Sequence, residues 1–276
     1  MTSLSTKPWN IKENINISHK EHLYNKQSGK ILQKSIFKKK IYFSNNIIFA
    51  RFNKSLDQPF KWIKKLKLTD NCVILDVGAN VGINSICYKK IFKKSKIYSF
   101  EPIKNTFKIL KKNIKRNKLN GSIKTFNFGF SNKNKKAFMS IPTAQQGERY
   151  KHYLSSALYS LYGKGKKKIK TKLLTIDKFV KDHKIKRIDF IKIDVEGHEY
   201  EILEGAKNSI KKFKPIIQSE FNYITRLLSK KNYKNYLEFA KKYNYRIMLL
   251  GKGYKIINKP NLNKISKYKF SDFIFF

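Results

Sequence analysis

Short apolar runs alternate along this chain with segments in which apolar residues recur at helical spacing. The runs are rich in β-branched and aromatic residues, which is typical of buried strands. We expect strands at Val73–Val77, Ile97–Phe100, Ile123–Phe128, Ile188–Ile193, Ile216–Ser219 and Tyr245–Leu250. Helical spacing lies between them, as at Thr106–Asn117 and Tyr200–Lys211. This alternation predicts an α/β fold with a doubly wound, mostly parallel sheet.

The two ends of the chain and one internal segment depart from this alternation. Residues 1–68 are expected to form a small N-terminal annex, with a polar start, one or two strands within Ile41–Phe52 and a helix. The main domain is expected to cover residues 69–276 and to carry an insertion at about 131–172, long enough for a lid or a substrate wall. The segment Phe270–Phe276 follows a short polar connection, which predicts a C-terminal antiparallel edge strand.

A turn of small residues follows the first buried strand. Asp76, Gly78, Asn80 and Gly82 belong to it, and such a turn lets backbone N–H groups approach a ligand at the start of a helix. The dinucleotide fingerprint fails, because its second and third glycines would fall on Asn80 and Ile83. The next strand ends at an acid, Glu101, which suits the two hydroxyls of a ribose. These features together predict binding of S-adenosylmethionine.

A second group of polar residues follows the strand predicted at Ile188–Ile193. Asp194 ends that strand, and Glu196, His198 and Glu199 come directly after it. Glu220 occupies the same position one strand later. Ligands of open α/β sheets bind at the carboxyl ends of the strands, so we expect this group to face the cofactor.

Taken together, Asp76–Gly82, Phe100–Pro102, Ile193–Glu199 and Pro215–Glu220 resemble the motifs of the FkbM family of S-adenosylmethionine-dependent methyltransferases. The resemblance covers residues of about 70 to 225. It implies a class I methyltransferase fold, which is Rossmann-like. It also implies transfer of a methyl group to a hydroxyl, typically of a sugar, a glycan or a small secondary metabolite.

The resemblance also implies which residues bind S-adenosyl-L-methionine. They share a position in the turns after the first three strands: Asp76, Gly78, Asn80, Gly82, Glu101, Asn127 and Gly129. The glycines and Asn80 would line the methionine moiety, with Asp76 near its amino group and Glu101 at the ribose hydroxyls. The turn around Asn127 would adjoin the adenine, although it offers no acid to the adenine amino group.

Methyl transfer needs an aligned acceptor oxygen and removal of its proton. The candidate catalytic residues are Asp194, His198 and Glu220, and we favour His198 or Glu220 as the base. Two structural alternatives stay open: Asp194 as a helix N-cap, and His198 as a hydrogen-bonding residue. A divalent metal at Asp194 and Glu220 is chemically feasible, but the resemblance does not require one and we expect none. Four tyrosines of the insertion either stack on a sugar or pack a loop: Tyr150, Tyr153, Tyr159 and Tyr162.

The charge broadens the range of partners. The formal net charge is +44, yet only 6 of the 62 basic residues are Arg, the side chain best suited to bases and phosphates. The abundance of Lys, Asn, Ile, Phe and Tyr is also what an AT-rich coding sequence produces. The charge therefore does not identify a nucleic-acid partner, and the acceptor that the resemblance implies, a small molecule or a glycan, is allowed to be anionic. An RNA 2′-hydroxyl methyltransferase and a basic, non-catalytic nucleic-acid-binding module remain the alternatives.

Cysteine content and hydropathy bear on location. Cys72 and Cys87 provide neither a disulfide framework nor a zinc-binding pattern. No run of eighteen apolar residues occurs, so we expect a cytoplasmic protein without a transmembrane segment. Nothing in the sequence indicates an oligomeric state.

Overall fold

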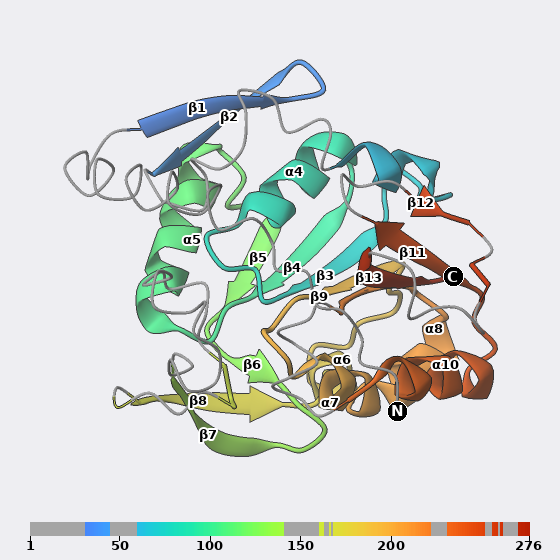
Figure 1. The fold of residues 1–276 in the computed structure, drawn as a ribbon. Coiled ribbons are helices and arrows are strands. Elements are labelled where there is room, and N and C mark those ends of the chain that lie inside the picture. The colour runs from blue at the N-terminus through green and yellow to red at the C-terminus, as the bar shows by residue number, and fades with distance from the viewer. Residues whose placement is uncertain are drawn as a thin grey trace, which may run out of the picture.

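The computed structural model describes residues 31–44, 60–140, 160–162, 166, 168–221, 231–251, 256–258, 260–261 and 270–276. Within these residues an eight-stranded sheet has the order β12-β11-β13-β10-β9-β3-β4-β5 (Figure 1). Its strands are β3 (Val73–Val77), β4 (Lys96–Phe100), β5 (Ile123–Phe126), β9 (Phe190–Ile193), β10 (Ile216–Glu220), β11 (Ile247–Gly251), β12 (Ile256–Ile257) and β13 (Phe270–Phe275). Five neighbouring strands of this sheet are parallel: β10, β9, β3, β4 and β5. This confirms the predicted, mostly parallel sheet.

Helices cover both faces of this sheet (Figure 1). One face carries α4 (Ile83–Ile91), α5 (Lys104–Arg116), the 3-10 helix η1 (Lys61–Lys65) and a hairpin of β1 (Ile31–Ile36) and β2 (Lys39–Ser44). The other face carries α6 (Ile176–Asp182), α7 (Glu199–Glu204), α8 (Lys207–Phe213) and α10 (Tyr233–Lys242). Each face has its own apolar core, and alternate residues of every central strand point into one core or the other. This arrangement confirms the α/β, doubly wound class.

The last strand lies inside the sheet. β13 is antiparallel, as expected, but it pairs with both β10 and β11, so its placement at the edge was wrong. Phe273, Ile274 and Phe275 are all fully buried, so this strand is covered on both faces, as an interior strand must be. The two-residue strand β12 ends the sheet instead.

Two predicted elements are shorter in the structure than the sequence predicts. The helix expected at Tyr200–Lys211 divides into α7 and α8 at Gly205, where an added Cβ would lie 2.1 Å from the backbone oxygen of Ser131. The strand expected at Ile123–Phe128 ends at Phe126, after which the chain leaves the main sheet. It enters a three-stranded sheet of β6 (Gly129–Phe130), β7 (Lys135–Ser140) and β8 (Lys168–Leu174).

The annex and the insertion are described in part. The hairpin packs Ile36, Ile41 and Phe43 into the core beneath α4 and α5. Asn117, after α5, fixes the hairpin: its side-chain oxygen accepts from the Tyr42 N–H at 2.9 Å, and its Nδ2 donates to the Tyr42 oxygen at 2.6 Å. Residues 45–52, which belong to the predicted strands, and the insertion tyrosines Tyr150, Tyr153 and Tyr159 lie outside the described residues. The domain boundary at residue 68 stays a prediction.

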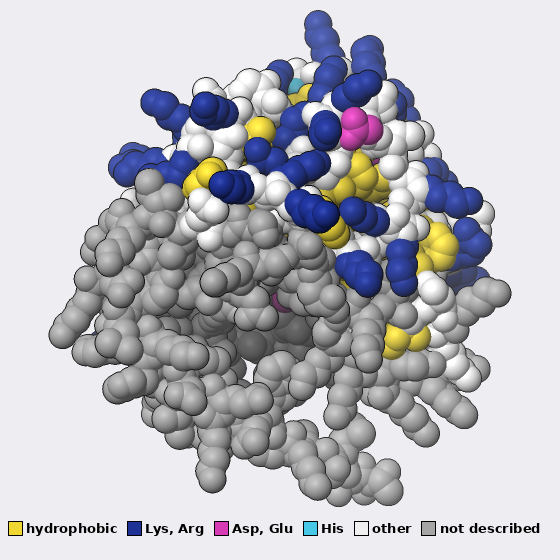
Figure 2. Space-filling view, turned by 90° about the horizontal axis from the view of Figure 1, so that it is seen from above, with side chains coloured by type: hydrophobic (Ala, Val, Ile, Leu, Met, Phe, Trp, Pro, Cys, Tyr) yellow, Lys and Arg dark blue, Asp and Glu magenta, His cyan; other side chains and the backbone are white. Residues whose placement is uncertain are grey.

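Charge is unevenly distributed over the surface. Between η1 and the end of α5 the acids are Asp70, Asp76 and Glu101, and the last two are buried. Lysines are numerous in the same stretch, and Figure 2 shows basic side chains scattered over the described part of this side, with little acidic surface. In the part of the chain that the structure describes, no helix is long and apolar enough to span a membrane.

Candidate functional site

The glycine turn after β3 has the backbone conformation that its sequence predicts. Gly78 and Gly82 have φ of 80° and 92°, and Asn80 has φ of 50°. An added Cβ on Gly78 would lie 1.9 Å from the backbone oxygen of Asp194, so no side chain fits between the turn and the end of β9. The turn therefore holds the two predicted groups of site residues against each other.

Asp76 lies just below this turn, on the face covered by α4. The residue is fully buried, and its Oδ2 accepts a hydrogen bond from the Ser85 hydroxyl of α4. Its other oxygen, Oδ1, is buried and has no hydrogen-bond partner among the described residues. Burial raises the pKa of this carboxyl. A buried oxygen without a partner is suited to an ammonium group, which fits the position expected beside the cofactor's amino group.

Glu101 joins the turn after β4 to the glycine turn. Its Oε2 accepts from the Asn80 N–H at 3.0 Å, and its Oε1 accepts from the Ile103 N–H at 2.8 Å. Burial raises the pKa of Glu101 to about 7, although these two hydrogen bonds favour the ionised form. Each carboxylate oxygen can accept a second hydrogen bond, so the group still suits the two hydroxyls of a ribose.

Gly129 lines a pocket, and Asn127 holds the turn beside it. The Asn127 side chain donates to the backbone oxygens of Glu101 at 2.8 Å and Pro102 at 3.1 Å, so it fixes the turn after β4. The pocket lies between the ends of β3 and β4, the loop after β9 and the three-stranded sheet, and its lining includes Gly78, Pro102, Gly129, Met139, Leu161 and His198. An apolar pocket beside Glu101 is compatible with an adenine ring.

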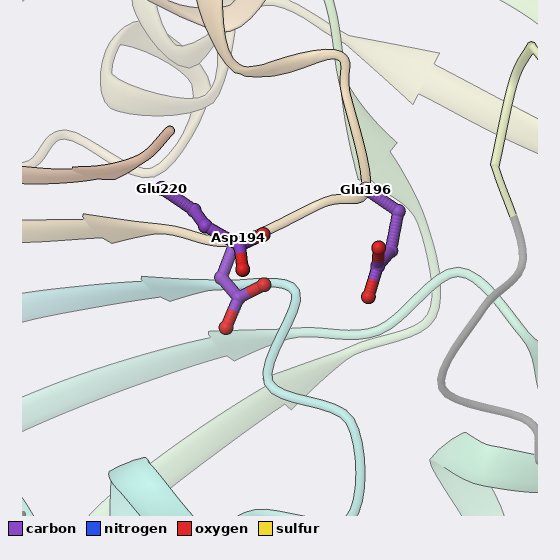
Figure 3. A group of neighbouring side chains, drawn as sticks. All are labelled: Asp194, Glu196 and Glu220. Carbon is purple, nitrogen blue, oxygen red and sulfur yellow. The ribbon is translucent and has the colours of Figure 1, made fainter. Parts of the chain in front are cut away.

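The carboxylates predicted at the second group come together at the ends of β9 and β10. Asp194, Glu196 and Glu220 place carboxylate oxygens within 4.8 Å of one another (Figure 3). Lys192 forms an ion pair with Asp194 at 2.7 Å. Glu199 Oε1 accepts the backbone N–H groups of Val195 and Gly197, in the loop between β9 and α7. Three close carboxylates could hold a divalent cation or share protons, and Lys192 already supplies one positive charge.

The acids of this group differ in charge. Burial works to raise the pKa of Asp194, but Lys192 and hydrogen bonds from Lys192 and Glu220 lower it overall. Burial and the neighbouring Asp194 raise the pKa values of Glu196 and Glu220 well above the ordinary range. The arrangement therefore favours ionisation of Asp194 over ionisation of the two glutamic acids. Asp194 is not a helix N-cap, because α7 begins after His198.

His198 is held by hydrogen bonds at both ring nitrogens. Nε2 lies 2.9 Å from the Ser131 hydroxyl, and Nδ1 lies 3.2 Å from the Tyr162 hydroxyl, which in turn donates to Glu201 at 3.0 Å. Burial lowers the pKa of His198 to about 4, so the ring is neutral. It lines the pocket, and its polar neighbours are Ser131, Tyr162 and Glu201, so its role as the base stays a prediction.

Sequence reasoning missed Lys192 and Ser131 as members of the site, and it named Tyr162 only as an insertion tyrosine for a sugar or for loop packing, without its contact with His198. A lysine within the apolar run Phe190–Ile193 was the available signal, since a charged residue in a central strand needs a buried partner. Ser131 and Tyr162 gave no comparable signal, because their contacts with His198 bring together segments far apart in the chain.

This geometry is that of a class I methyltransferase fold, and comparisons with known proteins agree. Residues 76–247 match the family described as "Methyltransferase FkbM domain", so the chain belongs to the FkbM methyltransferase family. It is similar to a solved FkbM methyltransferase from Methylobacillus flagellatus, with a TM-score of 0.50 and 16% identity over 76% of this chain and 45% of that one. The fold and the family expected from the sequence are thus confirmed.

Two curated proteins are also similar. The "Hexuronic acid methyltransferase AglP" of Haloferax volcanii is 31% identical over 140 residues, which is 50% of this chain and 51% of that protein. The "Methyltransferase sdnD" of Sordaria araneosa is 29% identical over 160 residues, 50% of this chain and 62% of that protein. The similarity therefore spans about half to two thirds of these relatives.

Proposed function

We propose that this methyltransferase uses S-adenosyl-L-methionine to methylate a hydroxyl of a sugar, a glycan or a small metabolite. The main support is the meeting of the glycine turn, the unpartnered Asp76 oxygen and the Glu101 carboxylate at one edge of the sheet. Bound there, the cofactor would supply an electrophilic methyl group. The related hexuronic acid methyltransferase supports a sugar as the acceptor class.

The residues divide into a binding set and a reacting set. Glu101 would accept hydrogen bonds from the ribose hydroxyls, Asp76 would pair with the amino group, and the backbone at Gly78 would approach the methionine moiety. Asp194 is the group best suited to accept the acceptor's proton, because Lys192 keeps it ionised and its side chain is 40% exposed. Burial raises the pKa of Glu220, so in its protonated form it would donate a hydrogen bond toward Asp194 instead of acting as a base.

Cofactor binding and turnover can be tested separately. Calorimetric titration with S-adenosylmethionine and S-adenosylhomocysteine should show binding by the wild-type protein. Transfer of a labelled methyl group should then be measured with neutral sugars, hexuronic acids and RNA as acceptors. Asp194→Asn should retain cofactor binding and lose at least about a hundredfold in transfer rate, within the usual range for a general base. Failure of the wild-type protein to bind either compound would refute the proposal.

The same experiment decides the nucleic-acid alternatives. The basic stretch from η1 to α5 would attract any polyanion, so binding of RNA alone does not identify an acceptor. Methyl transfer to RNA would support an RNA 2′-hydroxyl methyltransferase. Steeply salt-dependent binding without cofactor binding or transfer would support a non-catalytic module.

A further inference from the structure

A row of polar side chains crosses the centre of the sheet on the face covered by α4. Ser99 of β4 is in register with Asp76 of β3, Asp76 with Lys192 of β9, and Lys192 with Gln218 of β10. Residues in register on neighbouring strands point to the same face, so the four side chains are neighbours. Helix α4 covers the row with Ser85, whose hydroxyl contacts both Asp76 and Ser99.

Lys192 supplies the positive charge of this row. It is 5% exposed, and its Nζ lies 2.7 Å from Asp194 Oδ2. Burial alone would lower its pKa, but Asp194, Asp76 and Asp272 outweigh burial and raise it, so the ammonium stays charged. A charged lysine in a central strand is expensive to bury, so the carboxylates around it are required for its presence.

The position of this charge relates it to the proposed reaction. Asp76 and Asp194 flank the glycine turn, since Asp76 precedes Gly78 by two residues and the Asp194 backbone presses against Gly78. A methionine moiety bound at the turn would therefore lie beside both carboxylates. S-adenosylmethionine carries a positive sulfonium, and S-adenosylhomocysteine, its product, has a neutral sulfur. Both compounds carry the same amino and carboxyl groups, so a charge near the turn changes the ratio of the two affinities through the sulfonium alone.

We propose that Lys192 sets how strongly the site prefers S-adenosylmethionine, the substrate, over S-adenosylhomocysteine, the product. Its ammonium offsets part of the attraction that Asp76 and Asp194 exert on a sulfonium, which prevents overly tight binding of the ground state. This inference rests on the proposed function. It assigns to Lys192 a role in positioning charge, distinct from proton transfer.

Calorimetric titration with both compounds tests the role. Lys192→Met should raise the preference for S-adenosylmethionine over S-adenosylhomocysteine by roughly four- to fifteenfold. Coulomb's law gives this range for two unit charges separated by about 10 Å at an effective dielectric constant of about 20 to 40. Asp194→Asn should lower the preference, and Lys192→Arg should keep it near the wild-type value. Lys124→Met, the same change at an exposed position of β5, is the matched control and should leave it unchanged.

A double variant keeps the inference testable if Lys192→Met fails to fold. Lys192→Met leaves Asp76 and Asp194 without their cation, and this variant is expected to melt about 10 °C lower or to misfold. Lys192→Met combined with Asp194→Asn removes both charges of the pair and should recover stability and the wild-type preference. Equal changes in both affinities, in Lys192→Met or in Asp194→Asn, would overturn the inference while leaving cofactor binding intact. No binding of either compound by the wild-type protein would refute the proposed function and this inference with it.

Discussion

Glu101 should make cofactor affinity depend on pH near neutrality. Ribose hydroxyls donate hydrogen bonds, so they bind the ionised carboxylate more strongly than the acid. With the pKa at about 7 in the ligand-free protein, roughly nine tenths of Glu101 is ionised at pH 8 and roughly one tenth at pH 6. The dissociation constant for S-adenosylhomocysteine should therefore rise about tenfold from pH 8 to pH 6, provided that binding keeps the carboxylate ionised.

Calorimetry at pH 6, 7 and 8, in buffers of different ionisation enthalpy, would measure both the affinity and the protons released. About one proton should be released per ligand at pH 6, and close to none at pH 8. Glu101→Gln should bind more weakly at pH 8 and should lose the pH dependence. Glu199→Gln is the matched control, because burial also raises the pKa of Glu199 to about 7, and it should retain the dependence. A wild-type affinity that is constant with pH, or a Glu101→Gln variant with the wild-type slope, would refute the reasoning.

Three further changes test how the site is supported. Gly78→Ala should lower the free energy of unfolding by at least about 2 kcal/mol and abolish cofactor binding, because φ is 80° and the new Cβ would meet the Asp194 backbone. A variant with the same denaturation and binding curves as the wild-type protein would contradict this. Asn117→Ala should lower the free energy of unfolding by about 1 to 3 kcal/mol in urea, since it leaves the Tyr42 backbone groups without partners. Asn117→Asp should lose at least as much, because a carboxylate cannot donate to the backbone oxygens of Tyr42 and Asn113. His198→Phe should lower stability by about 1 to 3 kcal/mol and His198→Gln by less, and equal melting of the two variants would argue against the hydrogen-bonding role.

The sequence predicts the parts of this protein that depend on local patterns. The bounds of Val73–Val77 agree with β3, and the positive φ of Gly78 and Gly82 follows from a turn that must pass close to another strand. The meeting of Asp194 and Glu220 follows from a general property of parallel sheets, since both residues lie at the carboxyl ends of neighbouring strands.

The features that the sequence does not predict depend on contacts between distant segments. The helix breaks at Gly205 because the Ser131 backbone passes close to it, and the spacing of apolar residues in the helix does not predict such a contact. The hydrogen bonds of His198 depend on Tyr162, which comes from the insertion. The position of β13 was missed because an apolar, aromatic run fits an edge strand and an interior strand equally well, until burial on both faces decides between them.

The insertion of β13 between β10 and β11 has a consequence for synthesis on the ribosome. β10, α10 and β11 all leave the ribosome before the strand that joins β11 to the rest of the sheet. Until residues 270–275 emerge, β10 presents an open edge with unpaired backbone groups, and β11 has no place in the sheet. Nascent chains are therefore expected to stay susceptible to proteases and to pairing with other strands until this step, in which β13 pairs with both β10 and β11 and completes the sheet.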